Sequence, residues 1–247
     1  MTQTQTHPKL AKIKALLAKA EDPAALPEEA ELYFAKAAEL MAEHGIEQAM
    51  LADAKPETDK LTYRAFDVKG KYMADRAALL FSITHALGAR NVYWSLVDPL
   101  TRKRYRKVRV YAHESTLDRV ELLFSSLQLQ ALNGMQHARP QYGESTVSYR
   151  KSWLAGFASS VRNRLDQAEE TALRDATRGA GTAGAELVLV RREEAVENFF
   201  KRAHPKVKTA PRRRLSGTGW GDGRAAGERA DLGRGHLSNN RRKALSH

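Results

Sequence analysis

The chain has 247 residues, of which 42% are hydrophobic, and its formal net charge is +12. The absence of cysteine excludes disulfides and thiolate metal sites. No apolar stretch approaches the roughly 18 residues that a membrane span needs. The polar first residues lack the pattern of a signal peptide, so we expect a cytoplasmic protein.

Two helices are expected first. Pro8 opens a helix with Ile13 and Leu17 in its apolar stripe, and a second helix begins near Pro27 and ends at Gly45 as a glycine C-cap. A short third helix over residues 46–54 would follow. Residues 1–55 are therefore predicted to form a helical hairpin domain, which is too small to be very stable alone.

Residues 60–205 are predicted to form an α+β domain. Three strands are expected over residues 61–68, 91–97 and 104–112, with helices over 75–87, 115–133 and 147–177. Ser115 and Asp118 fit a capping box at the start of the second of these helices. An apolar strand over 186–190 and a helix over 193–203 complete the domain. This order favours a predominantly helical α+β fold, with helices packed on a small antiparallel sheet.

Positive charge is concentrated in residues 206–247, which contain 11 Lys and Arg against 3 Asp and Glu. Its basic clusters are Arg212, Arg213 and Arg214, and Arg241, Arg242 and Lys243. Seven glycines and few large apolar residues predict a loosely ordered basic tail. The spacing of Gly223 and Gly227 gives a faint indication of a short helix packed closely on another. Such a tail favours polyanions, whereas solubilisation or contact with an acidic protein is the alternative.

The best local candidate for binding is the hairpin formed by the second and third strands. Six of the eight residues from 102 to 109 are basic. Alternation places Val108, Val110 and Ala112 toward the core. Cations and aromatic rings then share the other face, as suits phosphate contacts with base stacking. The candidate residues are Arg102, Lys103, Arg104, Tyr105, Lys107, Arg109 and Tyr111. The competing interpretation is a solvated face on an edge strand whose charges prevent aggregation.

Motifs that would indicate catalysis are lacking. The glycines between Gly217 and Gly223 have neither the preceding strand nor the Gly-Lys-Ser/Thr ending of a phosphate-binding loop. No Gly-x-Ser-x-Gly occurs, and the histidines form no metal-binding pair with an adjacent Glu. His113, with His85 and His137 elsewhere, is the sole arrangement worth naming. We therefore expect no metal and no cofactor.

The N-terminal residues have a recognisable pattern. Lys12 to Ala20, then Glu28 to Glu31, and then Ala35 to Ile46, with Glu39-Leu40-Met41-Ala42-Glu43-His44-Gly45-Ile46, resemble the family catalogued as domain of unknown function 2786. Residues 149–158 and 187–190, and the glycines from Gly223 to Gly233, resemble a companion domain that often follows it. The resemblance implies an actinobacterial, phage or mobile-element setting. It implies no activity and no catalytic residues.

Three hypotheses about function follow from these patterns. The first is a non-enzymatic, nucleic-acid-associated protein that binds DNA or RNA through the basic hairpin and the basic tail. The second is a protein-interaction or phage assembly factor, in which the N-terminal helical hairpin docks on a protein partner. The third is an enzyme whose site is not visible from sequence. We favour the first, because cations are concentrated in two segments.

Overall fold

The structure, a computed structural model, describes residues 27–140, 142–180, 183–210 and 214–230, together with residues 12, 13, 15, 16 and 19. The chain forms, in order, α2 (Pro27–Ala54), the 3-10 turn η1 (Pro56–Thr58), β1 (Leu61–Lys69), α3 (Met73–Ala86), β2 (Arg90–Val97), β3 (Arg104–His113), α4 (Glu114–His137), α5 (Thr146–Ala180), α6 (Ala183–Ala203) and α7 (Trp220–Arg229). The prediction of a predominantly helical α+β fold is confirmed. Among the described helices, none combines the length and the apolar composition needed to cross a bilayer.

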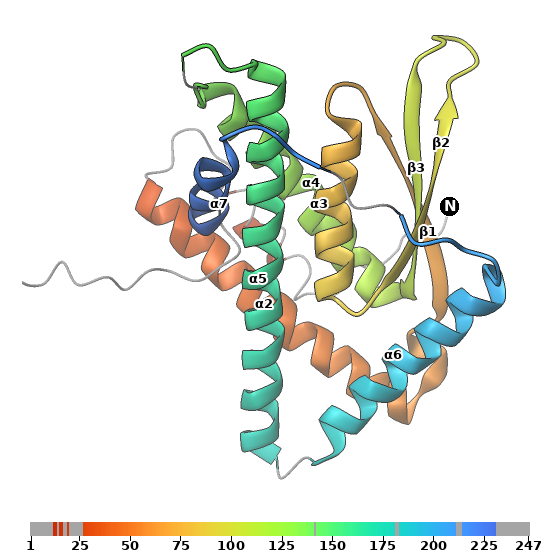
Figure 1. The fold of residues 1–247 in the computed structure, drawn as a ribbon. Coiled ribbons are helices and arrows are strands. Elements are labelled where there is room, and N and C mark those ends of the chain that lie inside the picture. The colour runs from red at the N-terminus through yellow and green to blue at the C-terminus, as the bar shows by residue number, and fades with distance from the viewer. Residues whose placement is uncertain are drawn as a thin grey trace, which may run out of the picture.

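The three strands form one antiparallel sheet in the order β1-β3-β2. Phe66 of β1 and Tyr93 of β2 both lie opposite Val108 of β3, which fixes the register. Helices α3 and α4 pack on one face of this sheet, and α5 runs beside α3 on the side away from the strands (Figure 1). On the other face of the sheet, which we call the outer face, α6 is the described helix that packs on the strands, and it crosses them near one end.

Alternation along β3 separates core from surface. Val108, Val110 and Ala112 are buried against the helices, as their spacing in the sequence predicts. They join a hydrophobic cluster in which Trp153 stacks on Phe157 of α5 with 5.5 Å between ring centroids. The other large members of this cluster include Val68, Leu80, Ile83, Leu117, Val120, Leu127 and Val161.

Gly45 does not end a helix, contrary to the prediction from the sequence. Helix α2 continues through it to Ala54, so the expected break and separate third helix are wrong. A Cβ at Gly45 would clash with the guanidinium of Arg119 on α4. The glycine therefore allows a buried arginine to lie against the helix backbone, and it has no role as a cap.

Residues 183–203 form the single helix α6, so the predicted strand over 186–190 is wrong. The buried residues Ala185, Val188, Val196 and Phe200 lie on one helical face, while Leu187 and Val190 are exposed. A short apolar run fits a strand and a helix equally well, and here the longer helical spacing decides.

The glycine-rich part of the predicted tail is folded. Residues 220–229 form α7, which packs along α5 with Gly223 against the backbone of Trp153 and Gly227 against Phe157. Arg164 of α5 donates a hydrogen bond to the Gly227 carbonyl over 2.9 Å. The prediction of a loosely ordered tail is therefore wrong for residues 214–230, and the weaker indication from the glycine spacing is confirmed. Residues 231–247 lie outside the described residues.

The hydrophobic cluster joins parts of the chain that were assigned to different domains. It includes Leu40 and Met41 of α2, the sheet and α3 to α5, and Ala230 after α7. The boundary near residue 55 stays a prediction.

Candidate nucleic-acid interface

The outer face of the sheet presents side chains from all three strands. β3 is the central strand, so its charges do not protect an exposed edge, and the edge-strand part of the competing interpretation is wrong. By register, Tyr63 lies opposite Tyr111, and Val92 and Ala65 lie opposite Arg109. Trp94 and Asp67 lie opposite Lys107, and Leu96 and Lys69 lie opposite Tyr105.

Arg109 lies at the centre of this face between two aromatic side chains. Its guanidinium carbon is 4.4 Å from the Tyr63 ring centroid and 5.4 Å from that of Trp94, both within cation–π range. Nη1 of Arg109 donates to the hydroxyl of Tyr111 over 3.3 Å, and this hydrogen bond raises the pKa of Arg109. Tyr63 is 50% exposed and Trp94 is 37% exposed, so both rings remain accessible beside a fixed positive charge.

Two lysines extend the positive charge toward the hairpin end. Nζ of Lys107 lies 3.9 Å from a carboxylate oxygen of Asp67, and Nζ of Lys69 lies 3.3 Å from one of Asp98. Nζ of Lys69 also lies 5.1 Å from the centroid of the Tyr105 ring. Exposed ion pairs of this kind contribute about 1 kcal/mol or less, so both lysines can exchange these partners for a phosphate.

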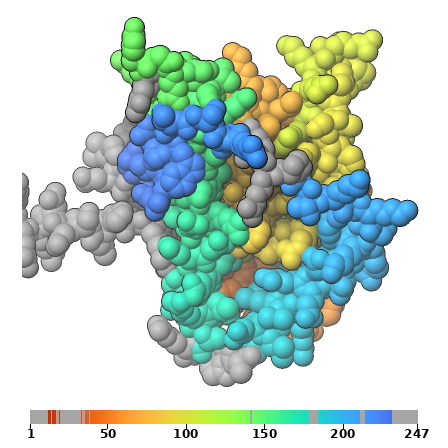
Figure 2. Space-filling model, in the orientation of Figure 1, coloured from red at the N-terminus to blue at the C-terminus, as the bar shows by residue number. Residues whose placement is uncertain are grey.

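The turn between β2 and β3 carries Arg102 and Lys103, β3 begins at Arg104, and all three side chains are exposed. Asp98 orders this turn, because its carboxylate accepts from the backbone N–H groups of Leu100 and Thr101. The hairpin end projects beyond the rest of the molecule (Figure 2). Three cations are thus held at a protruding end that continues from the outer face.

Tyr111 belongs to this face but is 1% exposed, so it offers no surface for the contact that the sequence predicts. Phe199 and Phe200 of α6 meet its ring edge-on, and its hydroxyl lies 2.7 Å from Nε2 of His204. Its position holds α6 against the sheet. Of the tail residues, Arg214 is exposed, whereas Arg212, Arg213, Arg241, Arg242 and Lys243 lie outside the described residues.

Tyr63, Lys69 and Trp94 were not selected from the sequence. They lie on the strands that flank β3, and only the strand register brings them beside Arg109. The aromatic residues at positions 63 and 94 within strand-like runs were a visible signal. No pattern in the sequence, however, placed both strands on either side of β3.

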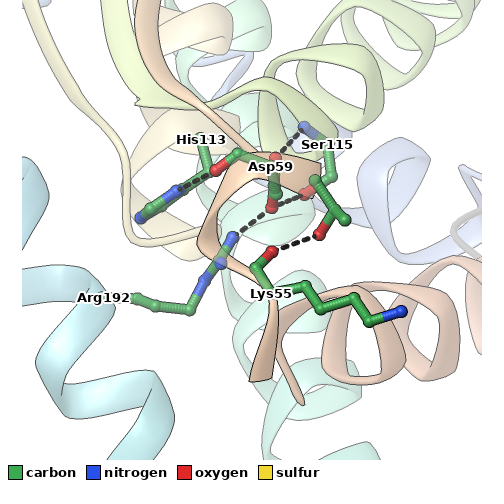
Figure 3. A network of polar contacts seen from close by, with 6 residues as sticks. Lys55, Asp59, His113, Ser115 and Arg192 are labelled. Atoms are coloured by element: carbon green, nitrogen blue, oxygen red, sulfur yellow. Dashed lines mark hydrogen bonds and ion pairs between the residues drawn. The ribbon is translucent and has the colours of Figure 1, made fainter. Parts of the chain in front are cut away.

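A buried polar network anchors α6 at the base of the sheet (Figure 3). The Asp59 carboxylate accepts from the backbone N–H of Ser115 over 2.9 Å, from its hydroxyl over 2.7 Å and from Arg192 over 2.5 Å. Burial opposes its charge, but these hydrogen bonds hold the pKa of the Asp59 carboxyl below its ordinary value. Asp59 therefore caps α4, and the predicted capping box is wrong because Asp118 pairs with Arg64.

His113 joins this network without forming a catalytic arrangement. Its Nδ1 donates to the Asp59 carbonyl over 3.1 Å, while the Ser115 hydroxyl bonds to the Asp59 carboxylate and not to the imidazole. Burial and the nearby Arg192 lower the pKa of His113. The pairing of a serine with a basic histidine that nucleophilic catalysis needs is thus not made here.

The other two histidines named from the sequence lie elsewhere. Nε2 of His85 contacts a guanidinium nitrogen of Arg162 at 3.1 Å, and Nδ1 of His137 donates to the Asn133 carbonyl. Within the described ranges, no three His, Asp or Glu side chains gather as a metal site requires.

Comparison with known families gives one match. Residues 9–48 match the family model described as Protein of unknown function (DUF2786). This confirms the family resemblance for the N-terminal segment. A search of curated proteins and a search of solved structures each found no match.

The DUF2786 segment and the outer face are separate parts of the protein. The matched residues include most of α2, which contributes Leu40 and Met41 to the core. Tyr63, Trp94 and Arg109 lie beyond the match. The DUF2786 segment thus helps to build the core that supports the sheet, and the binding surface must be judged on its own chemistry.

Proposed function

We propose that the protein associates with nucleic acid through the outer face of its sheet and the β2–β3 hairpin, without catalysing a reaction. The observation that supports this best is that Arg109 and Lys107 lie on the outer face and that Arg102, Lys103 and Arg104 are exposed at the adjoining hairpin end. Phosphate oxygens are the partners that suit such a surface, because each arginine or lysine that meets a phosphate releases condensed counterions.

The remaining parts of the hypothesis belong to this same proposal. The basic C-terminal residues, of which Arg214 is exposed on the described surface, would add contacts to the phosphate backbone. A cytoplasmic location, and the phage or mobile-element setting that the family resemblance implies, are consistent with a protein that handles nucleic acid.

Salt dependence tests the proposal directly. Binding of mixed DNA and RNA oligonucleotides should be strong at about 50 mM salt and should weaken steeply as salt rises. Replacing Arg102, Lys103 and Arg104 with Ala should flatten the logarithmic salt slope by about 2 to 3 units, since each phosphate contact contributes about 0.7 on single strands and about 0.9 on duplex DNA.

A charge-matched control distinguishes the effect of this surface on binding from the effect of net charge. Arg139 follows α4, Arg174 lies on α5 and Arg229 on α7, and all three are exposed, so their replacement with Ala removes the same charge from elements other than the strands. This control should leave the slope nearly unchanged. Equal effects of both triple variants, or no binding at about 50 mM salt, would contradict the proposal.

A further inference from the structure

The outer face has more exposed aromatic surface than phosphate binding requires. Tyr63 and Trp94 stand on the two edge strands and are 50% and 37% exposed, and Leu96 beside Trp94 is 36% exposed. Apolar side chains that adjoin one another within a rim of polar residues are typical of a binding surface. The position of these rings next to cations indicates what the ligand is.

Arg109 makes the two rings parts of one platform. Its guanidinium lies within cation–π distance of both, so its side chain is held extended across the central strand. Tyr63 lies opposite Tyr111 and Trp94 opposite Lys107, which are four residues apart on β3. The guanidinium carbon lies 4.4 Å from the Tyr63 ring centroid and 5.4 Å from that of Trp94, so the two rings lie within about 10 Å of each other. This spacing suits two neighbouring bases of one nucleic-acid strand.

We propose that the outer face binds single-stranded nucleic acid, with unpaired bases stacked on Tyr63 and Trp94 and the backbone held by Arg109, Lys107 and the hairpin end. This deepens the proposed function and rests on it. Bases inside a duplex are already stacked on each other, so a duplex can meet the cations of this face but not its rings. Stacking depends on the π-face that every base has, and it therefore gives strand selectivity with little preference for sequence.

The two ends of the outer face differ, and this difference determines how a bound nucleic-acid strand would lie across it. At one end, Phe199 and His204 cover Tyr111, and the His204 ring lies 5.8 Å from that of Trp94. At the other end, the face continues into the exposed cations of the hairpin. A bound strand would therefore stack its bases near Arg109 and extend its backbone toward Arg102.

The test compares a 15-nucleotide single strand of DNA or RNA with a duplex of the same length, using the full chain. We expect tighter binding of the single strand and quenching of Trp94 fluorescence when it binds. Tyr63→Ala and Trp94→Ala should each weaken single-strand binding by about 5- to 140-fold, as the loss of one stacked base predicts. Duplex binding should change less than two-fold in the same variants, and Trp94→Phe should restore most of the lost affinity.

Trp220 provides a matched control for Trp94. It is 44% exposed, with the guanidinium carbon of Arg224 5.8 Å from its ring centroid, but it lies on α7. Trp220→Ala should leave single-strand affinity unchanged. If the protein binds single strand and duplex equally and Tyr63→Ala and Trp94→Ala have no effect, the single-strand inference is wrong while the proposed function stands. If it binds neither, or only a protein partner, both are wrong.

Discussion

Gly223→Ala should destabilise the protein, because α7 packs too closely on α5 to admit a methyl group. A Cβ at Gly223 would lie on the carbonyl oxygen of Trp153, which is backbone and cannot turn aside as a flexible side chain would. Overpacking of this kind costs about 1–3 kcal/mol. The loss of stability cannot exceed the free energy with which α7 docks on α5, because the helix would detach before it accepted a larger clash.

Gly221→Ala is the control for this change. Gly221 lies two residues earlier in the same helix, is exposed, and has open space where a Cβ would be. There the substitution should stabilise the protein by about 0.5–1 kcal/mol, because alanine loses less backbone entropy in a helix. The two variants should thus differ by about 1.5–4 kcal/mol, with opposite signs.

Thermal unfolding followed by circular dichroism measures both changes. For a protein of this size each kcal/mol shifts the melting temperature by about 2–4 °C, so the variants should melt at least about 3 °C apart. Melting of Gly223→Ala at or above the wild-type temperature would refute the close packing of α7 on α5. It would also restore the view that residues 214–230 contribute little to folding.

Two further predictions concern stability. Trp153→Ala should cost about 3–5 kcal/mol in urea unfolding, because Trp153 is 2% exposed and stacks on Phe157, whereas Trp220→Ala should cost far less; equal losses would mean that the core is misplaced. The lowered pKa of the partly buried His113 means that the folded state binds its proton less well than the unfolded state does. Stability should therefore fall as pH drops below about 6.5, and His113→Gln should reduce this dependence. If His113→Gln shows the same dependence of stability on pH as the wild type, His113 is not the group responsible. His204, whose pKa is also lowered, would then account for the loss of stability at low pH.

The predictions from sequence were most accurate where one hydrophobic period ran over many residues. The strands and helices from β1 to α5 match their expected ranges within a few residues, because alternation and helical stripes are long there. The errors arose at glycines and at a short apolar run. Gly45 and Gly223 serve close contacts with Arg119 and Trp153, and such partners are set by tertiary packing that local sequence does not encode.

The candidate site was predicted in part for the same reason. Alternation within β3 correctly separated Val108 and Val110 from the residues on the outer face. It could not show that α6 covers Tyr111, since this contact joins residues 111 and 199. Nor could it bring Tyr63 and Trp94 to either side of Arg109, because strand order is a property of the fold.

The strand order also dictates when the sheet can form during synthesis. β1 and β2 both pair with β3 and not with each other, and β3 is the last of the three along the chain. A growing chain that ends before Arg104 therefore has two strands with no partner, and Val68 of β1 has no sheet to hold it against the helices. β2 and β3 are neighbours in sequence, whereas β1 pairs with β3 over a long sequence separation, with Leu61 opposite His113. The β2–β3 hairpin is therefore the part of the sheet that can form locally, and β1 can pair with it afterwards. The segment that completes the sheet is therefore the same hairpin that carries the exposed cations Arg102, Lys103 and Arg104.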